Sequence, residues 1–82
     1  MKIQVTQKHI DEGFRGSCSS DPICLAMKDA GLKRPWVSPD HIAWDLDNRH
    51  YSVKTPELVW GFMVDYDTGR YVRPFEFELE GV

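Results

Sequence analysis

Two cysteines and three histidines are the side chains of this 82-residue sequence best suited to bind a metal ion. Cys18 and Cys24 are separated by five residues, whereas zinc hooks place roughly two to four residues between their cysteines. The histidines His9, His41 and His50 show no paired spacing that would complete such a site. A metal site that uses Cys18 and Cys24 is therefore an alternative, and we expect no metal or other cofactor.

Cys24 also has one feature of a nucleophile. It falls in the first turn of an expected helix, and a helix N-terminus can lower the pKa of a thiol. Catalysis would need a general base such as His9 beside it, and nothing in the sequence brings the two together. A disulfide to Cys18 is a further alternative, although thiols stay reduced in the cytoplasm. We expect Cys24 to be a small core residue and the protein not to be an enzyme.

The closely spaced carboxylates form two groups. Asp45 and Asp47 make the first, and Glu76, Glu78 and Glu80 make the second. Alternate residues of a strand face the same side, about 6.6–7 Å apart, so each group should form a row. Acid–base chemistry needs carboxylates that converge in a pocket. The rows therefore predict either a solvated sheet face or an acidic stripe that meets a basic protein surface.

The charge is unevenly distributed along the chain. The net charge is −3, and the C-terminal half, residues 42–82, has eight Asp and Glu but four Lys and Arg. An acidic half is unsuited to phosphate backbones and suits a basic protein partner, so direct contact with nucleic acid is not expected. A small nucleic-acid-binding or regulatory module remains an alternative, because Lys28, Lys33 and Arg34 lie near Trp36.

Membrane segments and secretion signals are not apparent in the sequence. It contains no run of about 18 apolar residues, and its N-terminus lacks the apolar stretch of a signal peptide. We therefore expect a protein of the cytoplasm, without contact with a membrane.

Strand patterns occur at both ends and in the middle of the chain. Residues 2–6 alternate between polar and apolar, and residues 75–79 repeat this pattern. Residues 42–46 and 51–53 predict a hairpin, since Asp47-Asn48 tolerates a tight turn. The segment 33–39 contains two prolines and predicts a linker.

Helix signals occupy the remaining segments. Asp21-Pro22 and Thr55-Pro56 each place a capping residue before a proline, which is typical of a helix start. The first helix should end at Gly31 and the second should run from Pro56 to about Thr68. Residues 1–82 are therefore expected to form a single α+β domain, with a small, mostly antiparallel sheet of three to four strands and two main helices on one face.

The second main helix has an anomaly on its outer side. Its expected buried arc is Leu58, Val59, Phe62, Met63 and Tyr66. Trp60 and Val64 project away from that arc, where a surface helix should be polar. Tryptophan is enriched at binding hot spots, although a second layer, such as the loop with Trp36, or a homodimer partner could cover Trp60. The predicted partner-binding residues are Trp60, Val64, Asp45, Asp47, Glu76, Glu78 and Glu80.

Three segments carry a likeness to known sequences. They are residues 2–13 (KIQVTQKHIDEG), residues 22–31 (PICLAMKDAG) and residues 73–79 (RPFEFEL). With these segments the chain resembles small uncharacterised proteins of bacteriophages and prophages, whereas residues 33–54 show no such likeness. Those proteins often carry a second cysteine just before the proline, where this chain has Asp21.

The resemblance implies a phage context but no activity and no functional residues. Small acidic phage proteins are frequently inhibitors of host machinery, and anti-CRISPR proteins are among them. Our leading hypothesis is therefore a protein of the host cytoplasm that binds and inhibits a host protein. A CRISPR–Cas complex or another nucleic-acid-handling defence complex would be such a partner.

Overall fold

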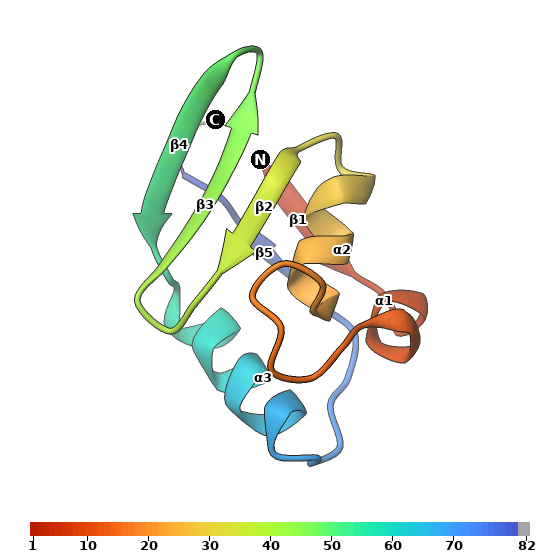
Figure 1. Ribbon diagram of the computed structural model, residues 1–82. Coiled ribbons are helices and arrows are strands. Elements are labelled where there is room, and N and C mark those ends of the chain that lie inside the picture. The colour runs from red at the N-terminus through yellow and green to blue at the C-terminus, as the bar shows by residue number, and fades with distance from the viewer. Residues whose placement is uncertain (81–82) are drawn as a thin grey trace.

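The computed structural model describes residues 1–80, which form three helices and five strands (Figure 1). The expected α+β class is confirmed. In chain order the elements are β1 (Lys2–Val5), α1 (Gln7–Glu12), α2 (Pro22–Asp29), β2 (Lys33–Val37), β3 (His41–Leu46), β4 (Arg49–Lys54), α3 (Glu57–Asp67) and β5 (Phe75–Glu78).

The strands divide into two antiparallel sheets, whereas the sequence predicted one. β2, β3 and β4 form a three-stranded sheet, and β1 pairs with β5 alone. In Figure 1 the three-stranded sheet lies in front of the β1–β5 pair, with α2 beside β2 and α3 below. Buried side chains from both sheets and from the helices form one apolar core.

β2 replaces the linker expected over residues 33–39. It lies at the edge of its sheet, where a proline is tolerated because no ladder hydrogen bond is required of it. The pairing register with β3 shifts between Lys33 and Trp36, and Arg34 has a positive φ of 47°. This irregularity accommodates Pro35 within the strand.

The β3–β4 hairpin follows the expected pattern. Asp47 and Asn48 form its turn with φ angles of 52° and 63°, a conformation that Asp and Asn adopt more readily than most residues. Ile42 and Trp44 point inward and are fully buried. Trp44 stacks on Tyr51 of β4, with 5.6 Å between the ring centroids.

Helix α3 contacts the core through a narrower face than the sequence predicted. Val59, Phe62, Met63 and Tyr66 are buried, but Leu58 is 58% exposed. The buried four follow the spacing i, i+3, i+4 and i+7, which is one helical stripe. Leu58 precedes that stripe by one position, so the helix rotates it towards solvent.

The helix starts differ in how they are capped. Asp21 accepts a hydrogen bond from the backbone N–H of Cys24 at 2.8 Å and caps α2 as expected. Thr55 does not cap α3: its hydroxyl donates to the carbonyl of Ser38 at 2.7 Å, and α3 begins at Glu57 without a side-chain cap. Thr55 instead ties the start of α3 to the β2–β3 loop.

The loop between α1 and α2 is fastened to α3. The Tyr66 hydroxyl donates to the carbonyl of Gly13 at 2.8 Å, and Arg15 Nε donates to the carbonyl of Tyr66 at 2.9 Å. Gly13 also packs so closely on Pro22 that an added Cβ would lie 2.6 Å from the proline Cδ. These contacts hold the entry to α2 in place.

Candidate functional site

Three large apolar side chains of α3 contact solvent. At about 100° per residue, Trp60 and Val64 lie on one side of the buried stripe and Leu58 lies on the other. Leu58 is 58% exposed, Trp60 46% and Val64 37%. The expected exposure of Trp60 and Val64 is therefore present, and no second layer within residues 1–80 covers them. Leu58 was expected in the core, and its single-position offset from the buried stripe is the signal that could have placed it outside. We call these three residues the α3 face.

A groove runs along the Leu58 side of α3. It has a volume of about 530 Å³ and lies between α3 and the connector that leads to β5. Gly61 opens it, because an added Cβ at this position would meet no atom within 4 Å. Its apolar lining is Leu58, Gly61, Phe62, Tyr71, Val72, Pro74 and Phe75, and its charged rim is Glu57, Asp65 and Arg73.

A second hollow lies at Trp60, away from the first groove. It has a volume of about 500 Å³ and is lined by Trp60, by Pro39 of the β2–β3 loop and by residues 54–57. Trp60 lines this second hollow only, whereas Leu58 and Gly61 line the first groove.

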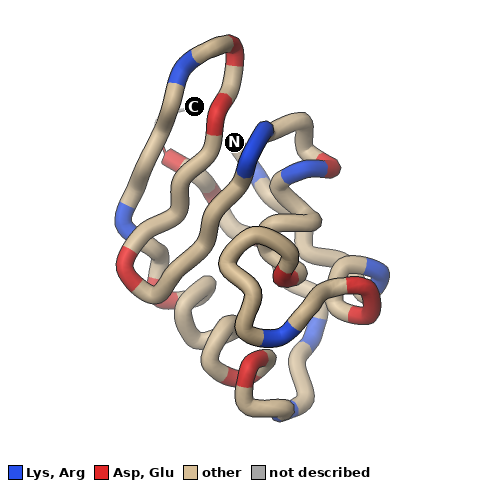
Figure 2. The backbone as a smooth tube through the Cα atoms, viewed as in Figure 1, with Lys and Arg blue, Asp and Glu red and all other residues tan. Residues whose placement is uncertain are grey.

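The charges on α3 are all acidic. Glu57, Asp65 and Asp67 belong to the helix, which contains no Lys or Arg (Figure 2). Asp65 lies 3.5 Å from Arg70 and Asp67 accepts a hydrogen bond from the N–H of Gly16. Glu57 makes no ion pair within residues 1–80. The apolar residues of the α3 face therefore lie between negatively charged residues at the two ends of the helix.

Asp45 and Asp47 do not form the expected row. Asp47 lies in the β3–β4 turn, while Asp45 lies within β3. Asp45 accepts hydrogen bonds from His50 Nδ1 at 2.8 Å and from Arg34 Nε at 2.6 Å. These two donors, His50 first, lower the pKa of Asp45. Its charge is already compensated, which leaves less of it for a partner.

Glu76, Glu78 and Glu80 are exposed, as a solvated row requires. Lys2 Nζ lies 3.8 Å from Glu76, and the N-terminal amine lies 3.3 Å from Glu78. The row is thus interleaved with positive charge from β1. In Figure 1 the β3–β4 turn and α3 lie at opposite ends of the molecule. The seven predicted residues accordingly lie in the β3–β4 hairpin, in α3 and in or just after β5, and the hairpin turn is far from α3.

Cys24 is a core residue, whereas Cys18 is half-buried in the loop before α2. Both are free thiols, and Cys24 is fully buried. The Cys24 thiol donates to the carbonyl of Cys18 at 3.1 Å, and burial raises the pKa of this thiol. The hydrogen bonds of His9 within residues 1–80 go to Thr6 and Asp29, not to this thiol. Within residues 1–80, no group of three or more His, Cys, Asp and Glu side chains is arranged to hold a metal ion.

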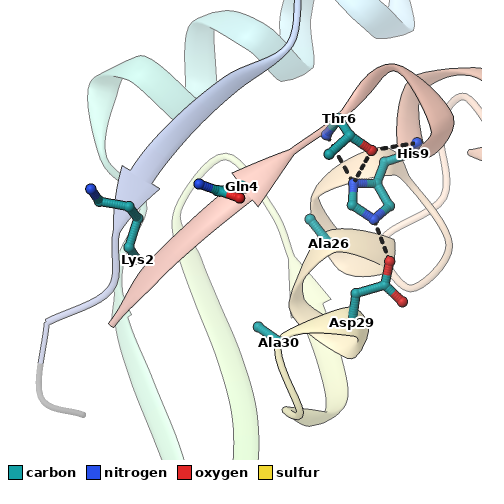
Figure 3. A pocket seen from close by; sticks show the side chains of 7 residues that line it. All are labelled: Lys2, Gln4, Thr6, His9, Ala26, Asp29 and Ala30. Atoms are coloured by element: carbon teal, nitrogen blue, oxygen red, sulfur yellow. Dashed lines mark hydrogen bonds and ion pairs between the residues drawn. The ribbon is translucent and has the colours of Figure 1, made fainter.

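His9 instead joins α1 to α2, a link that the sequence did not reveal. Its Nδ1 accepts a hydrogen bond from the backbone N–H of Thr6 at 2.9 Å, and its Nε2 lies 2.6 Å from Asp29 Oδ2 (Figure 3). Since Nδ1 is an acceptor, Nε2 carries the proton and donates it to Asp29. The hydrogen bond from His9 lowers the pKa of Asp29. Both ring nitrogens are occupied, so His9 acts as a structural bridge.

The basic residues near Trp36 are only partly gathered. Trp36 is 46% exposed on the outer face of the three-stranded sheet, opposite Ala43 of β3. Arg34 is engaged with Asp45, and Lys28 lies on α2. The nucleic-acid alternative thus retains an exposed aromatic side chain with little free positive charge beside it.

No helix within residues 1–80 combines the length and the apolar character needed to cross a membrane. Comparisons of the chain with protein-family models, curated proteins and solved structures found no match.

Proposed function

We propose that this protein is a protein-binding module whose α3 face docks on an apolar surface of its partner. The observation that carries this proposal is the exposure of Leu58, Trp60 and Val64 on one helix. Tryptophan is among the residues enriched at interface hot spots, so Trp60 is the expected anchor. The acidic ends of α3 add a second requirement, since they favour a partner whose apolar surface is rimmed by Lys and Arg.

A host protein is the partner class that we propose. The resemblance of both chain ends to phage proteins supports a function in an infected cell. A surface rimmed by Lys and Arg is common on proteins that handle nucleic acid. An acidic module that covers such a surface would inhibit the host protein by competition, and an anti-CRISPR function would be one case.

The expected energetic role of Trp60 can be stated. Truncation of an interface hot spot costs about 2 kcal/mol or more, which corresponds to about a 30-fold loss of affinity. The same substitution also removes some packing, because more than half of Trp60 is buried. Trp36→Ala, at equal exposure, removes a similar amount, so a loss of affinity in Trp60→Ala alone separates binding from stability.

The chain offers a matched control for this test. Trp36 and Trp60 are both 46% exposed, but they lie on different surfaces. Partners captured from bacterial host lysate by the wild type are identified, and their dissociation constants are measured for Trp60→Ala and Trp36→Ala. We expect about a 30-fold loss for Trp60→Ala and little change for Trp36→Ala.

A second variant blocks the groove and leaves Trp60 in place. Gly61→Leu projects a side chain into open space, so it should preserve the fold and weaken binding. Equal binding by wild type, Trp60→Ala and Gly61→Leu would refute the α3 face as the interface. Loss of binding only in Trp36→Ala, together with salt-sensitive binding of single-stranded DNA or RNA, would favour the nucleic-acid alternative.

A further inference from the structure

One edge of β1 is open, and the pairing of β1 with β5 shows which atoms it presents. Met1 and Leu79 exchange two hydrogen bonds: the terminal amine donates to Leu79 O at 3.0 Å, and Leu79 N–H donates to Met1 O at 2.8 Å. Hydrogen-bonded and non-hydrogen-bonded pairs alternate along an antiparallel ladder. Ile3 and Val5 therefore bond to β5, whereas Lys2 and Gln4 direct their N–H and C=O groups to the opposite edge.

The next residue in this series confirms the direction. Thr6 follows Gln4 by two positions, so its N–H should point to the same edge. It donates to Nδ1 of His9 at 2.9 Å. The backbone groups of Lys2 and Gln4 have no such hydrogen-bond partner at this edge within residues 1–80. The open edge thus offers two donors and two acceptors and ends at the His9 bridge.

A hollow of about 400 Å³ lies along this edge, and we call it the β1 groove. Figure 3 shows β1 on one side of it and α2 on the other. The α2 side is formed by two small residues, of which Ala30 is exposed and Ala26 is buried. Its lining is Lys2, Gln4, Thr6, His9, Ala26, Asp29 and Ala30.

Asp29 supplies the one negatively charged side chain in the lining of the β1 groove, which also contains Lys2. Its side chain is 69% exposed, and His9 occupies only Oδ2. Because the hydrogen bond from His9 favours the ionised carboxylate, Asp29 carries its charge at neutral pH. The free Oδ1 can accept a hydrogen bond from a Lys or Arg side chain of a bound segment.

We propose that the β1 groove binds an extended segment of a partner protein, which adds to the β1–β5 sheet as a third strand and places a Lys or Arg at Asp29. The backbone groups of Lys2 and Gln4 provide the main-chain hydrogen bonds, as in other cases of strand addition. The site is separate from the α3 face. A second copy of the chain fits the groove less well, because its own α2 would meet this α2.

Short edge strands that carry a lysine can also serve simply to prevent unwanted pairing. Amide hydrogen exchange of the full chain distinguishes an edge that binds a partner from an edge that only prevents pairing. In the free protein, Ile3 and Val5 should exchange slowly and Lys2 and Gln4 quickly. The probe is a peptide selected against the full chain from a random display library. We expect it to slow exchange of Lys2 and Gln4 at least about tenfold, with Ile3 and Val5 as internal controls.

Three variants make the test specific. Ala30→Arg places a long side chain in the groove from an exposed position and should abolish peptide binding. Asp29→Asn can still accept the hydrogen bond from His9, so it should keep the fold and reduce the preference for Lys or Arg. Trp60→Ala should leave peptide binding unchanged, so that this proposal and the α3 proposal can fail independently.

Several results would overturn the proposal. One is slow exchange of Lys2 and Gln4 in the free protein, which would mean that the edge is already covered. Another is protection that depends on protein concentration without peptide, which would assign the edge to a second copy. The last is a selection that yields no peptide able to protect these amides, or only peptides that Ala30→Arg binds equally well.

Discussion

Asp21→Asn should make this protein more stable at neutral pH, because the native carboxylate is buried. Asp21 is 4% exposed, and burial raises its pKa from 3.8 to about 6, although the N–H of Cys24 donates to it. The negative charge of Asp67 adds to this rise. The folded chain therefore holds the Asp21 proton more tightly than the unfolded chain does.

The sign of the pH dependence follows from this difference. The stabilisation that protonated Asp21 provides is complete below about pH 3.8 and is lost as the pH rises to about 6. At about 1.4 kcal/mol for each pKa unit, the loss amounts to at most about 3 kcal/mol. The favourable interaction of a carboxylate with the N-terminus of α2 is worth about 0.3–1 kcal/mol, so the burial penalty exceeds it.

Asparagine isolates the charge, because it is an equally good helix cap. The free energy of unfolding is measured by urea denaturation from pH 4 to pH 8 for wild type, Asp21→Asn and the exposed control Glu12→Gln. We expect Asp21→Asn to be more stable by about 1–3 kcal/mol at pH 8 and nearly equal to wild type at pH 4. Asp29 and Asp45, whose pKa values are lowered, contribute to the free energy of unfolding with the opposite pH dependence. Both proteins contain these residues, so their contributions cancel when the free energy of the wild type is subtracted from that of Asp21→Asn. A variant less stable than wild type at pH 8 would refute this reasoning.

Three further substitutions test the packing by urea denaturation. Gly13→Ala should destabilise the protein by about 1–3 kcal/mol, because the new Cβ would lie 2.6 Å from Pro22 Cδ; an unchanged midpoint would contradict this contact. Gly61→Ala should stabilise it by about 0.5–1 kcal/mol, since the Cβ meets nothing within 4 Å; a loss of stability would show that the groove is closed. Tyr66→Phe should cost about 1 kcal/mol, because it removes the donor to Gly13 O; no loss would mean that this bond does not hold the loop.

The candidate site was only partly predictable. The exposure of Trp60 followed from helical periodicity, because the angle between Trp60 and the apolar stripe is a property of the helix alone. The groove along the Leu58 side of α3 could not be predicted from periodicity, because the connector that lines this groove approaches α3 only in the folded chain. Leu58 illustrates the limit: a shift of one position along the stripe separates a core residue from an exposed one.

Local chemistry in the sequence was sufficient for the α+β class, the turn at Asp47-Asn48 and the start of α2 at Asp21, since each depends on neighbouring residues. The pairing of β1 with β5, the conversion of residues 33–37 into an edge strand and the bridge between His9 and Asp29 depended on the folded chain. Each joins groups that are distant in sequence or depends on a neighbouring strand. Residue spacing records which side chains share a face, but not which face another segment will cover. The open edge of β1 exists for that reason: β5 covers one side of the strand, and the β1 groove lies along the other.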